Sequence, residues 1–91
     1  MAIVVIPALL RKFTMGQERV DARGRNVGEI IDDLDRQFPG FRPHLVEGGD
    51  LKRSIAVSID GELGTAGLLD KVADASEVHF LPALGGGKDC G

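Results

Sequence analysis

Residues 78–91 read VHFLPALGGGKDCG, an apolar strand pattern that runs directly into three glycines and a short polar tail. A strand rich in Val, Phe and Leu must be buried against neighbours. The glycines have no side chain to pack, and glycine loses more entropy on ordering than any other residue. A linker needs a second domain after it, and only four residues follow Gly87. We therefore expect a folded domain over residues 1–84 and a flexible tail over residues 85–91 that enters another protein.

The composition is that of one ordinary globular domain. The 91 residues are 43% hydrophobic and 27% charged, which allows a single modest core but no deep catalytic cleft with its own supporting shell. The chain starts MAIVVIP, without a basic region and with too short an apolar run for a signal peptide. No run is long enough to span a membrane. We therefore expect a cytoplasmic protein with no membrane partner.

The charge and the cysteine content exclude two further classes of function. A net charge of −3, with no Trp or Tyr to stack on bases, argues against a nucleic-acid partner. Five basic residues predict a solvated basic edge, with docking onto an acidic partner as the second interpretation: Arg11, Lys12, Arg19, Arg23 and Arg25. The single cysteine, Cys90, can form neither an internal disulfide nor a metal cluster by itself, which excludes ferredoxin-like iron–sulfur chemistry.

One amphipathic helix is the clearest element. Asn26 and Glu29 form a capping box, in which each side chain satisfies a backbone N–H at the helix start. The apolar residues that follow form a single stripe and stop at Pro39-Gly40, which prevents continuation: Val27, Ile30, Ile31, Leu34 and Phe38. This pattern predicts a helix that begins at Val27 and lies across a sheet. Its other face is acidic, and we interpret it as solvated, with a basic partner surface as the alternative.

Strand patterns flank this helix. The nearly continuous apolar run of residues 2–6 predicts a central strand covered on both faces, which forms a hairpin with the alternating residues 18–22. A strand over residues 54–59, a brief edge strand at 62–64 and the last strand over 76–81 complete a mixed sheet of four to five strands. The first and last strands should pair in parallel at its middle. We therefore expect an α+β fold with one main helix packed across the sheet.

The remaining segments predict connections. We expect Leu9, Leu10 and Phe13 to lie in the connection between the first two strands. Residues 41–50 predict a loop that includes a helical turn at 43–47. Residues 67–72 predict a short turn of helix with three side chains in the core: Leu68, Leu69 and Val72.

This order of elements, with an apolar last strand running into a glycine arm, resembles the β-grasp, ubiquitin-like sulfur carriers of the ThiS and MoaD family. The resemblance covers nearly the whole chain, and within the family the chain is most similar to the CysO type. Three motifs support it, of which the last is the most specific: IPALLR at residues 6–11, NVGEIIDDL at residues 26–34 and FLPALGGG at residues 80–87.

The resemblance implies a function for the tail made of Gly85, Gly86 and Gly87. An ATP-using adenylyltransferase of the ubiquitin-activating type would adenylate the carboxylate of Gly87, and sulfur would then displace AMP to give a thiocarboxylate. The nucleotide and its magnesium belong to that partner, so the resemblance implies no catalytic residue, metal or cofactor in this chain, which is not itself an enzyme. A downstream sulfur-accepting biosynthetic enzyme is a further partner. A monomer suits a carrier that docks on several enzymes.

The chain departs from the family pattern after Gly87. Family members active as carriers end in Gly-Gly, whereas here Lys88 to Gly91 follow and leave the Gly87 carbonyl in a peptide bond. Some related carriers are made with extra residues that a JAMM-type zinc metallopeptidase removes. We expect a similar cleavage between Gly87 and Lys88. An inert tail is the second interpretation, and the use of Gly91 as the working terminus beside a reactive Cys90 is the third.

Phe80 and Leu81 are candidates for docking the activating enzyme. Because alternate strand residues face the core, at most one of the two should be exposed. We expect His79 to be a surface strand residue without a catalytic role, because a lone imidazole lacks the partners that a general base needs.

Two rival functions remain open at this stage. A ubiquitin-like modifier would use the same activated Gly87 to acylate lysines on target proteins. A plain interaction domain would make no chemical use of its glycine tail, since fold does not dictate function. The sequence does not name the sulfur acceptor, and the CysO-like character favours a sulfur amino acid or a specialised metabolite.

Overall fold

The computed structural model describes residues 1–82, so our predictions for the glycine tail and for a domain boundary after residue 84 lie outside the described residues. The strands are β1 (Ala2–Val5), β2 (Arg19–Ala22), β3 (Val46–Glu47), β4 (Asp50–Leu51), β5 (Ile55–Ile59), β6 (Glu62–Leu63) and β7 (Glu77–Pro82). The α-helix is α1 (Val27–Gln37), and the 3-10 helices are η1 (Ala8–Thr14), η2 (Arg42–His44) and η3 (Gly67–Leu69). Within residues 1–82, no helix is long and apolar enough to cross a membrane.

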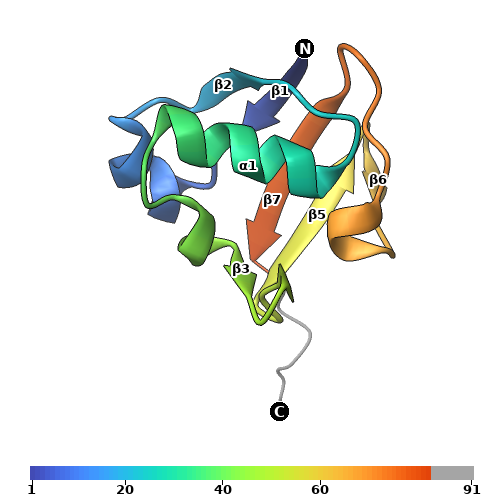
Figure 1. Cartoon of the computed structure of the whole chain (residues 1–91). Coiled ribbons are helices and arrows are strands. Elements are labelled where there is room, and N and C mark those ends of the chain that lie inside the picture. The colour runs from blue at the N-terminus through green and yellow to red at the C-terminus, as the bar shows by residue number, and fades with distance from the viewer. Residues whose placement is uncertain (83–91) are drawn as a thin grey trace.

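Five strands form one mixed sheet in the order β2-β1-β7-β5-β6, and α1 crosses it (Figure 1). β1 pairs with β2 in an antiparallel hairpin and with β7 in parallel, where Val5 lies opposite His79. β5 pairs antiparallel with β7 on its other side. These pairings confirm the predicted α+β class and the parallel pairing of the first and last strands at the middle of the sheet.

The helix begins where its capping box predicts. Asn26 Oδ1 accepts a hydrogen bond from the Glu29 N–H at 2.8 Å, and Glu29 Oε1 accepts one from the Arg25 N–H at 2.9 Å. The apolar stripe of α1 is fully buried against the sheet: Val27, Ile30, Ile31 and Leu34. This burial supplies most of the stability of such a short helix, because isolated helices of its length are marginal in water.

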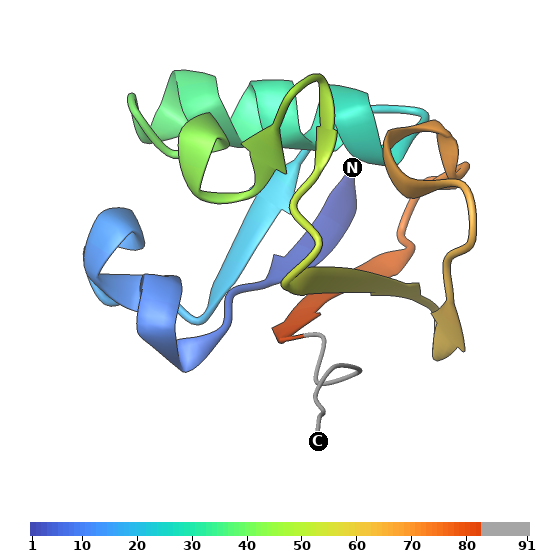
Figure 2. The same cartoon turned by 90° about the horizontal axis from the view of Figure 1, so that it is seen from below.

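The sheet has one covered face. Ala2 and Val4 of β1 are buried beneath α1, whereas Ile3 and Val5, which point the other way, are only partly buried. Figure 2 shows α1 lying to one side of the sheet. No segment among residues 1–82 covers the second face of β1, so the prediction that this strand is covered on both faces is wrong. The apolar run misleads because its second face borders charged side chains of β2 and β7, which keep that surface in water.

Three short segments differ from the predictions. Residues 8–14 form the 3-10 helix η1, and residues 46–51 form the β3–β4 hairpin, where a connection and a loop were expected. The helical turn predicted at residues 43–47 lies at η2, over residues 42–44. Leu69 is 77% exposed, so its predicted place in the core is wrong, although Leu68 packs against the core and Val72 is buried. The η3 helix is a single turn, which can turn only one of two adjacent leucines inward.

Candidate functional site

The end of β7 separates two neighbouring side chains. Phe80 is 1% exposed and lies opposite Val57 of β5 in the core. Leu81 is 39% exposed on the other face of the sheet. Burial removes Phe80 as a docking candidate, because a partner cannot reach its ring. Leu81 is the accessible member of the pair, and its role in docking stays a prediction.

Leu81 shares its face of the sheet with side chains from three strands. Directly paired residues project to the same face, and His79 is paired with both Val5 of β1 and Ser58 of β5. Ser58 is paired in turn with Leu63 of β6, which is 69% exposed. We call this surface the open sheet face and define it by Ile3, Val5, Leu63, His79 and Leu81. Its side chains are aliphatic apart from one imidazole, and the charged residues Arg19 and Glu77, paired with Val5 and Ile3, flank them on the same face. Exposed apolar groups with a polar rim are common on protein-binding surfaces.

Ionic contacts border the open sheet face along β7. His79 Nε2 lies 2.8 Å from Glu77 Oε1, and Arg19 Nη1 of β2 lies 3.6 Å from Glu77 Oε2. The hydrogen bond with His79 lowers the pKa of the Glu77 carboxyl, and the charges of His79 and Arg19 act in the same direction. Glu77 therefore stays ionised to a lower pH than an ordinary glutamate. The structure places His79 at the surface, as predicted.

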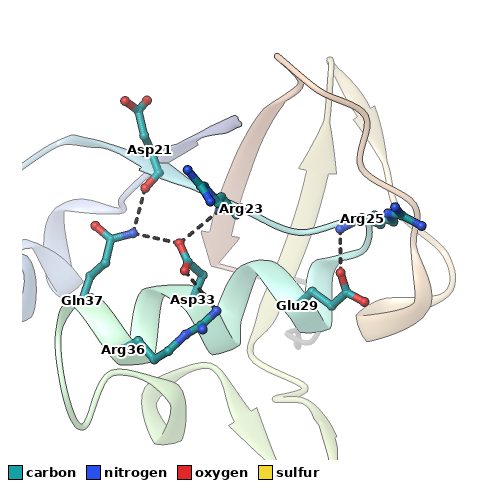
Figure 3. A network of polar contacts seen from close by, with 7 residues as sticks. All are labelled: Asp21, Arg23, Arg25, Glu29, Asp33, Arg36 and Gln37. Carbon is teal, nitrogen blue, oxygen red and sulfur yellow. Dashed lines mark hydrogen bonds and ion pairs between the residues drawn. The ribbon is translucent and has the colours of Figure 1, made fainter.

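The backbone N–H groups of Arg23 and Arg25, before the start of α1, belong to a network of hydrogen bonds (Figure 3). Asp33 Oδ2 accepts hydrogen bonds from the Arg23 N–H at 3.1 Å and from Gln37 Nε2 at 3.0 Å. Asp33 Oδ1 accepts from Arg36 Nη2 at 3.2 Å. A Cβ atom at Gly24 would lie 2.7 Å from the Ile30 nitrogen, so only glycine lets this connection approach the helix so closely. The network holds the β2–α1 connection against the helix.

The acidic face of α1, which we predicted to be solvated, also makes structural hydrogen bonds. Asp35 Oδ1 accepts hydrogen bonds from the Gly40 and Arg42 N–H groups, and Asp32 Oδ1 accepts one from Arg42 Nε at 3.1 Å. These carboxylates hold the segment that follows the helix. The sequence does not predict these hydrogen bonds, because they form only when residues 40–42 fold back against α1. Among residues 1–82, no group of three or more His, Cys, Asp or Glu side chains could hold a metal ion.

The residues predicted to do the chemistry lie outside the described residues. These are the tail glycines Gly85, Gly86 and Gly87, the cleavage position between Gly87 and Lys88, and Cys90. The structure does show the strand that precedes them in the chain, β7. β7 is the central strand of the sheet, held on both sides by β1 and β5, so the last described residue has a fixed position relative to the open sheet face.

Comparisons with known proteins agree on one family. The sequence profile of the ThiS family matches residues 4–87. The sulfur carrier protein CysO of Mycobacterium tuberculosis (strain ATCC 25618 / H37Rv) is 35% identical over 89 residues, which cover 92% of this chain and 96% of the relative. The profile match ends at Gly87, so the last four residues lie beyond the part that matches the family.

Solved structures support the same fold. A crystal structure of the Amycolatopsis orientalis BexX/CysO complex contains a chain with a TM-score of 0.88 and 37% identity, covering 96% of this chain and 100% of that one. The solution structure of the small archaeal modifier protein 1 from Methanosarcina acetivorans has a TM-score of 0.76 and 26% identity, over 94% of this chain and 95% of that one. The fold is therefore the β-grasp, ubiquitin-like fold.

Proposed function

The chain belongs to the ThiS family, and from that premise we propose that it is a sulfur carrier that holds sulfur as a thiocarboxylate on Gly87. The observation that carries this proposal is the profile match, which runs through the whole domain and ends at the last of the three glycines. The CysO relative is named a sulfur carrier protein, and it is 35% identical over nearly its full length.

The proposed chemistry starts with removal of residues 88–91. A metallopeptidase hydrolyses the Gly87–Lys88 peptide bond, which gives a free carboxylate on Gly87 and releases the tetrapeptide. The activating enzyme then joins this carboxylate to the AMP moiety of ATP, and pyrophosphate leaves. A sulfide donor attacks the acyl carbon, AMP leaves, and a thiocarboxylate remains. A glycine suits these steps because it has no side chain to obstruct an attacking group.

The open sheet face is the surface on which we propose that the activating enzyme docks. It lies on the strand that leads into the tail, and its aliphatic side chains are available to a partner: Leu81, Val5 and Leu63. The similar chain from Amycolatopsis orientalis was crystallised in a BexX/CysO complex, which supports docking of this fold on a second protein. This chain contributes the tail and the docking surface, and its partners contribute the catalytic groups.

A protein modifier is the second candidate, and the archaeal relative named a modifier protein favours it. A modifier would form the same adenylate but would then acylate lysine amines on other proteins. The two candidates therefore differ only after activation.

An intact-mass experiment tests the proposal. A chain of residues 1–87 is incubated with an activating enzyme of the ubiquitin-activating type, Mg-ATP and sulfide. We expect a mass gain equal to the replacement of one oxygen by one sulfur, and no gain for the full chain ending at Gly91. Equal sulfur uptake by both chains would contradict the role of Gly87, and lysine-linked adducts without free thiocarboxylate would favour the modifier.

A further inference from the structure

The 3-10 helix η1 has an exposed stripe that the proposed function does not use. A 3-10 helix has three residues per turn, so Leu9 and Lys12, both within η1, lie on the same side. Leu9 is 82% exposed, Met15 is 84% exposed, and Lys12 between them is also exposed. We call these three residues the η1 stripe. Single exposed apolar residues are ordinary, but here two almost fully exposed ones lie on one short segment, Leu9 within η1 and Met15 at its C-cap, and together with Lys12 they form a ridge.

The rest of η1 is fixed to the body of the protein. Leu10 and Phe13 pack against the core, and the Phe13 ring stacks on His44 of η2 with 3.8 Å between ring centroids. The Thr14 side chain is fully buried, and its hydroxyl lies 2.9 Å from the Gln17 carbonyl oxygen. The η1 stripe is therefore presented by a rigid segment, which lowers the entropy cost of binding.

Met15 has a left-handed backbone conformation, which glycine and asparagine adopt more readily than methionine does. Its φ of 57° and ψ of 35° are left-handed, and it closes η1 at a position where helices usually have glycine or asparagine. Glycine would relieve this strain. A large apolar side chain that is strained and almost fully exposed contributes little to folding. Its presence points instead to a contact with another molecule.

The topology places η1 at the same end of the sheet as the start of the tail, namely the end where β1 and β7 both finish. β1 and β7 are parallel, so their carboxyl ends lie at the same edge, and Figure 2 shows both arrowheads pointing the same way. Val5, opposite His79, is followed after Ile6 and Pro7 by η1, and Pro82 ends β7 three residues after His79. A protein that handles the tail therefore approaches the side of the domain from which η1 projects.

We propose that the η1 stripe is a docking ridge for the enzyme that adenylates Gly87, an inference that rests on the proposed function. Lys12 has no carboxylate within ion-pair distance among residues 1–82, and its Nζ lies 5.2 Å from the centroid of the Phe13 ring. Arg11, in contrast, is engaged by Glu18 and by the Ile6 carbonyl. The partner surface therefore presents two apolar pockets with a carboxylate between them.

The adenylating enzyme is the occupant that fits best. It holds the carrier through two steps, adenylation and displacement of AMP by sulfur, whereas a peptidase needs only one cleavage. A second contact on η1 extends the surface that the partner binds beyond the open sheet face. Lys12, which has no ion-pair partner in the described part of the chain, also gives the interface a basic residue, in line with the acidic partner considered for the basic edge.

Kinetics of activation test the inference. Chains of residues 1–87 with Leu9→Ser, Lys12→Glu or Met15→Gly are compared with wild type in the adenylation assay with the activating enzyme. We expect each change to raise KM for the carrier by about tenfold, with kcat unchanged. High salt should reduce the effect of Lys12→Glu and leave that of Leu9→Ser. Leu69→Ser is the matched control, because Leu69 is a 77% exposed leucine on η3.

Met15→Gly separates docking from folding. It removes the side chain and relieves the left-handed strain, so the domain should keep its melting temperature while KM rises. If Leu9→Ser and Met15→Gly give the same KM as Leu69→Ser, the docking ridge is wrong, although wild-type activation would leave the sulfur-carrier function intact. If the same substitutions made in the chain of residues 1–91 slow only the removal of residues 88–91 by the peptidase, the peptidase is the occupant and the inference is wrong. Failure of wild-type residues 1–87 to be adenylated would reject both proposals.

Discussion

At the scale of single residues, adjacent positions in β7 have opposite roles. Alternation predicts that only one of Phe80 and Leu81 is accessible, but it does not say which one. The choice depends on register, since Phe80 faces inward only because β7 pairs with Val57 of β5 in the way observed. Sequence gives the period of a strand, whereas its phase relative to the core comes from its neighbours.

Phe80→Ala should destabilise the domain strongly. The ring is 1% exposed, and removing a buried phenylalanine typically costs about 3–5 kcal/mol, through lost burial and the cavity that remains. A small domain has a total stability of about 5–15 kcal/mol, so the variant should be partly unfolded near 37 °C. Urea denaturation followed by circular dichroism measures the loss. A change below about 1 kcal/mol would contradict the burial of this ring.

Leu81→Ser should affect docking and leave folding nearly unchanged. Its side chain lies on the open sheet face, and exposed substitutions usually change stability by about 0.5 kcal/mol or less. We expect a higher KM for the carrier in adenylation with an unchanged kcat. Phe80→Ala is the contrasting variant, because it loses activity through unfolding. Wild-type KM for Leu81→Ser would remove Leu81 from the interface.

Asp60 gives a prediction that depends on pH. Its Oδ1 accepts a hydrogen bond from the Glu77 N–H and its Oδ2 accepts one from the Ser76 hydroxyl, both at 2.9 Å. These bonds, the first the larger cause, lower the pKa of the Asp60 carboxyl. Because the folded-state pKa lies below the unfolded one, the bonds stabilise the protein above the unfolded pKa. That stabilisation is lost as the pH falls through the folded pKa.

Asp60→Asn should therefore lower the melting temperature at neutral pH, with a smaller difference in acid. Asparagine tolerates the φ of 53° at this position, so backbone strain does not account for the loss. The two donors lie at different oxygens of Asp60, and asparagine places an NH2 group at one of them, so at most one of the two donors keeps its acceptor. Thermal unfolding at neutral and acid pH measures the two differences. Asp21→Asn is the control, and a difference for Asp60→Asn that does not change with pH would contradict the assignment.

At the scale of elements, the long helix was predictable and the short ones were not. The capping box and apolar stripe of α1 are local signals that need no knowledge of the rest of the chain. In contrast, η1 depends on stacking of Phe13 on His44, and the β3–β4 hairpin is extended by a hydrogen bond from the Lys52 N–H to the Leu45 carbonyl. A contact with a separate segment fixes η1, and pairing within the hairpin fixes β3 and β4, while the residues of these short pieces show no period of their own.

Asn26→Ala tests the local signal at the start of α1. Removal of the side chain leaves the Glu29 N–H without its 2.8 Å acceptor, and loss of such a cap typically costs about 1 kcal/mol. Chemical denaturation should show this decrease with an unchanged dependence on denaturant concentration. Asn26→Asp is the matched control, because aspartate is an equally good cap, and it should retain the stability. Equal losses in both variants would mean that the cap contributes little.

At the scale of the whole molecule, the chain order already predicts the mixed sheet, but not its open face. A continuous apolar strand is the signature of two covered faces, and β1 has that pattern. The structure instead uses the second face of β1, with β6 and β7, as a surface of mixed apolar and ionic side chains. The uncovered second face of β1 is therefore also the surface on which we propose that the partner binds. Such a departure from the usual pattern is expected where function competes with stability.

This arrangement separates docking from chemistry, because the proposed docking surfaces lie within residues 1–82 and the reacting atom is at Gly87. The uncleaved chain should therefore compete with residues 1–87 for the activating enzyme, although its Gly87 carbonyl is in a peptide bond and cannot be adenylated. We expect the uncleaved chain to raise KM for residues 1–87 without lowering kcat. The uncleaved chain with Leu81→Ser should compete less well. If excess uncleaved chain leaves the adenylation rate unchanged, recognition requires the freed carboxylate itself, and docking through the domain surface is secondary.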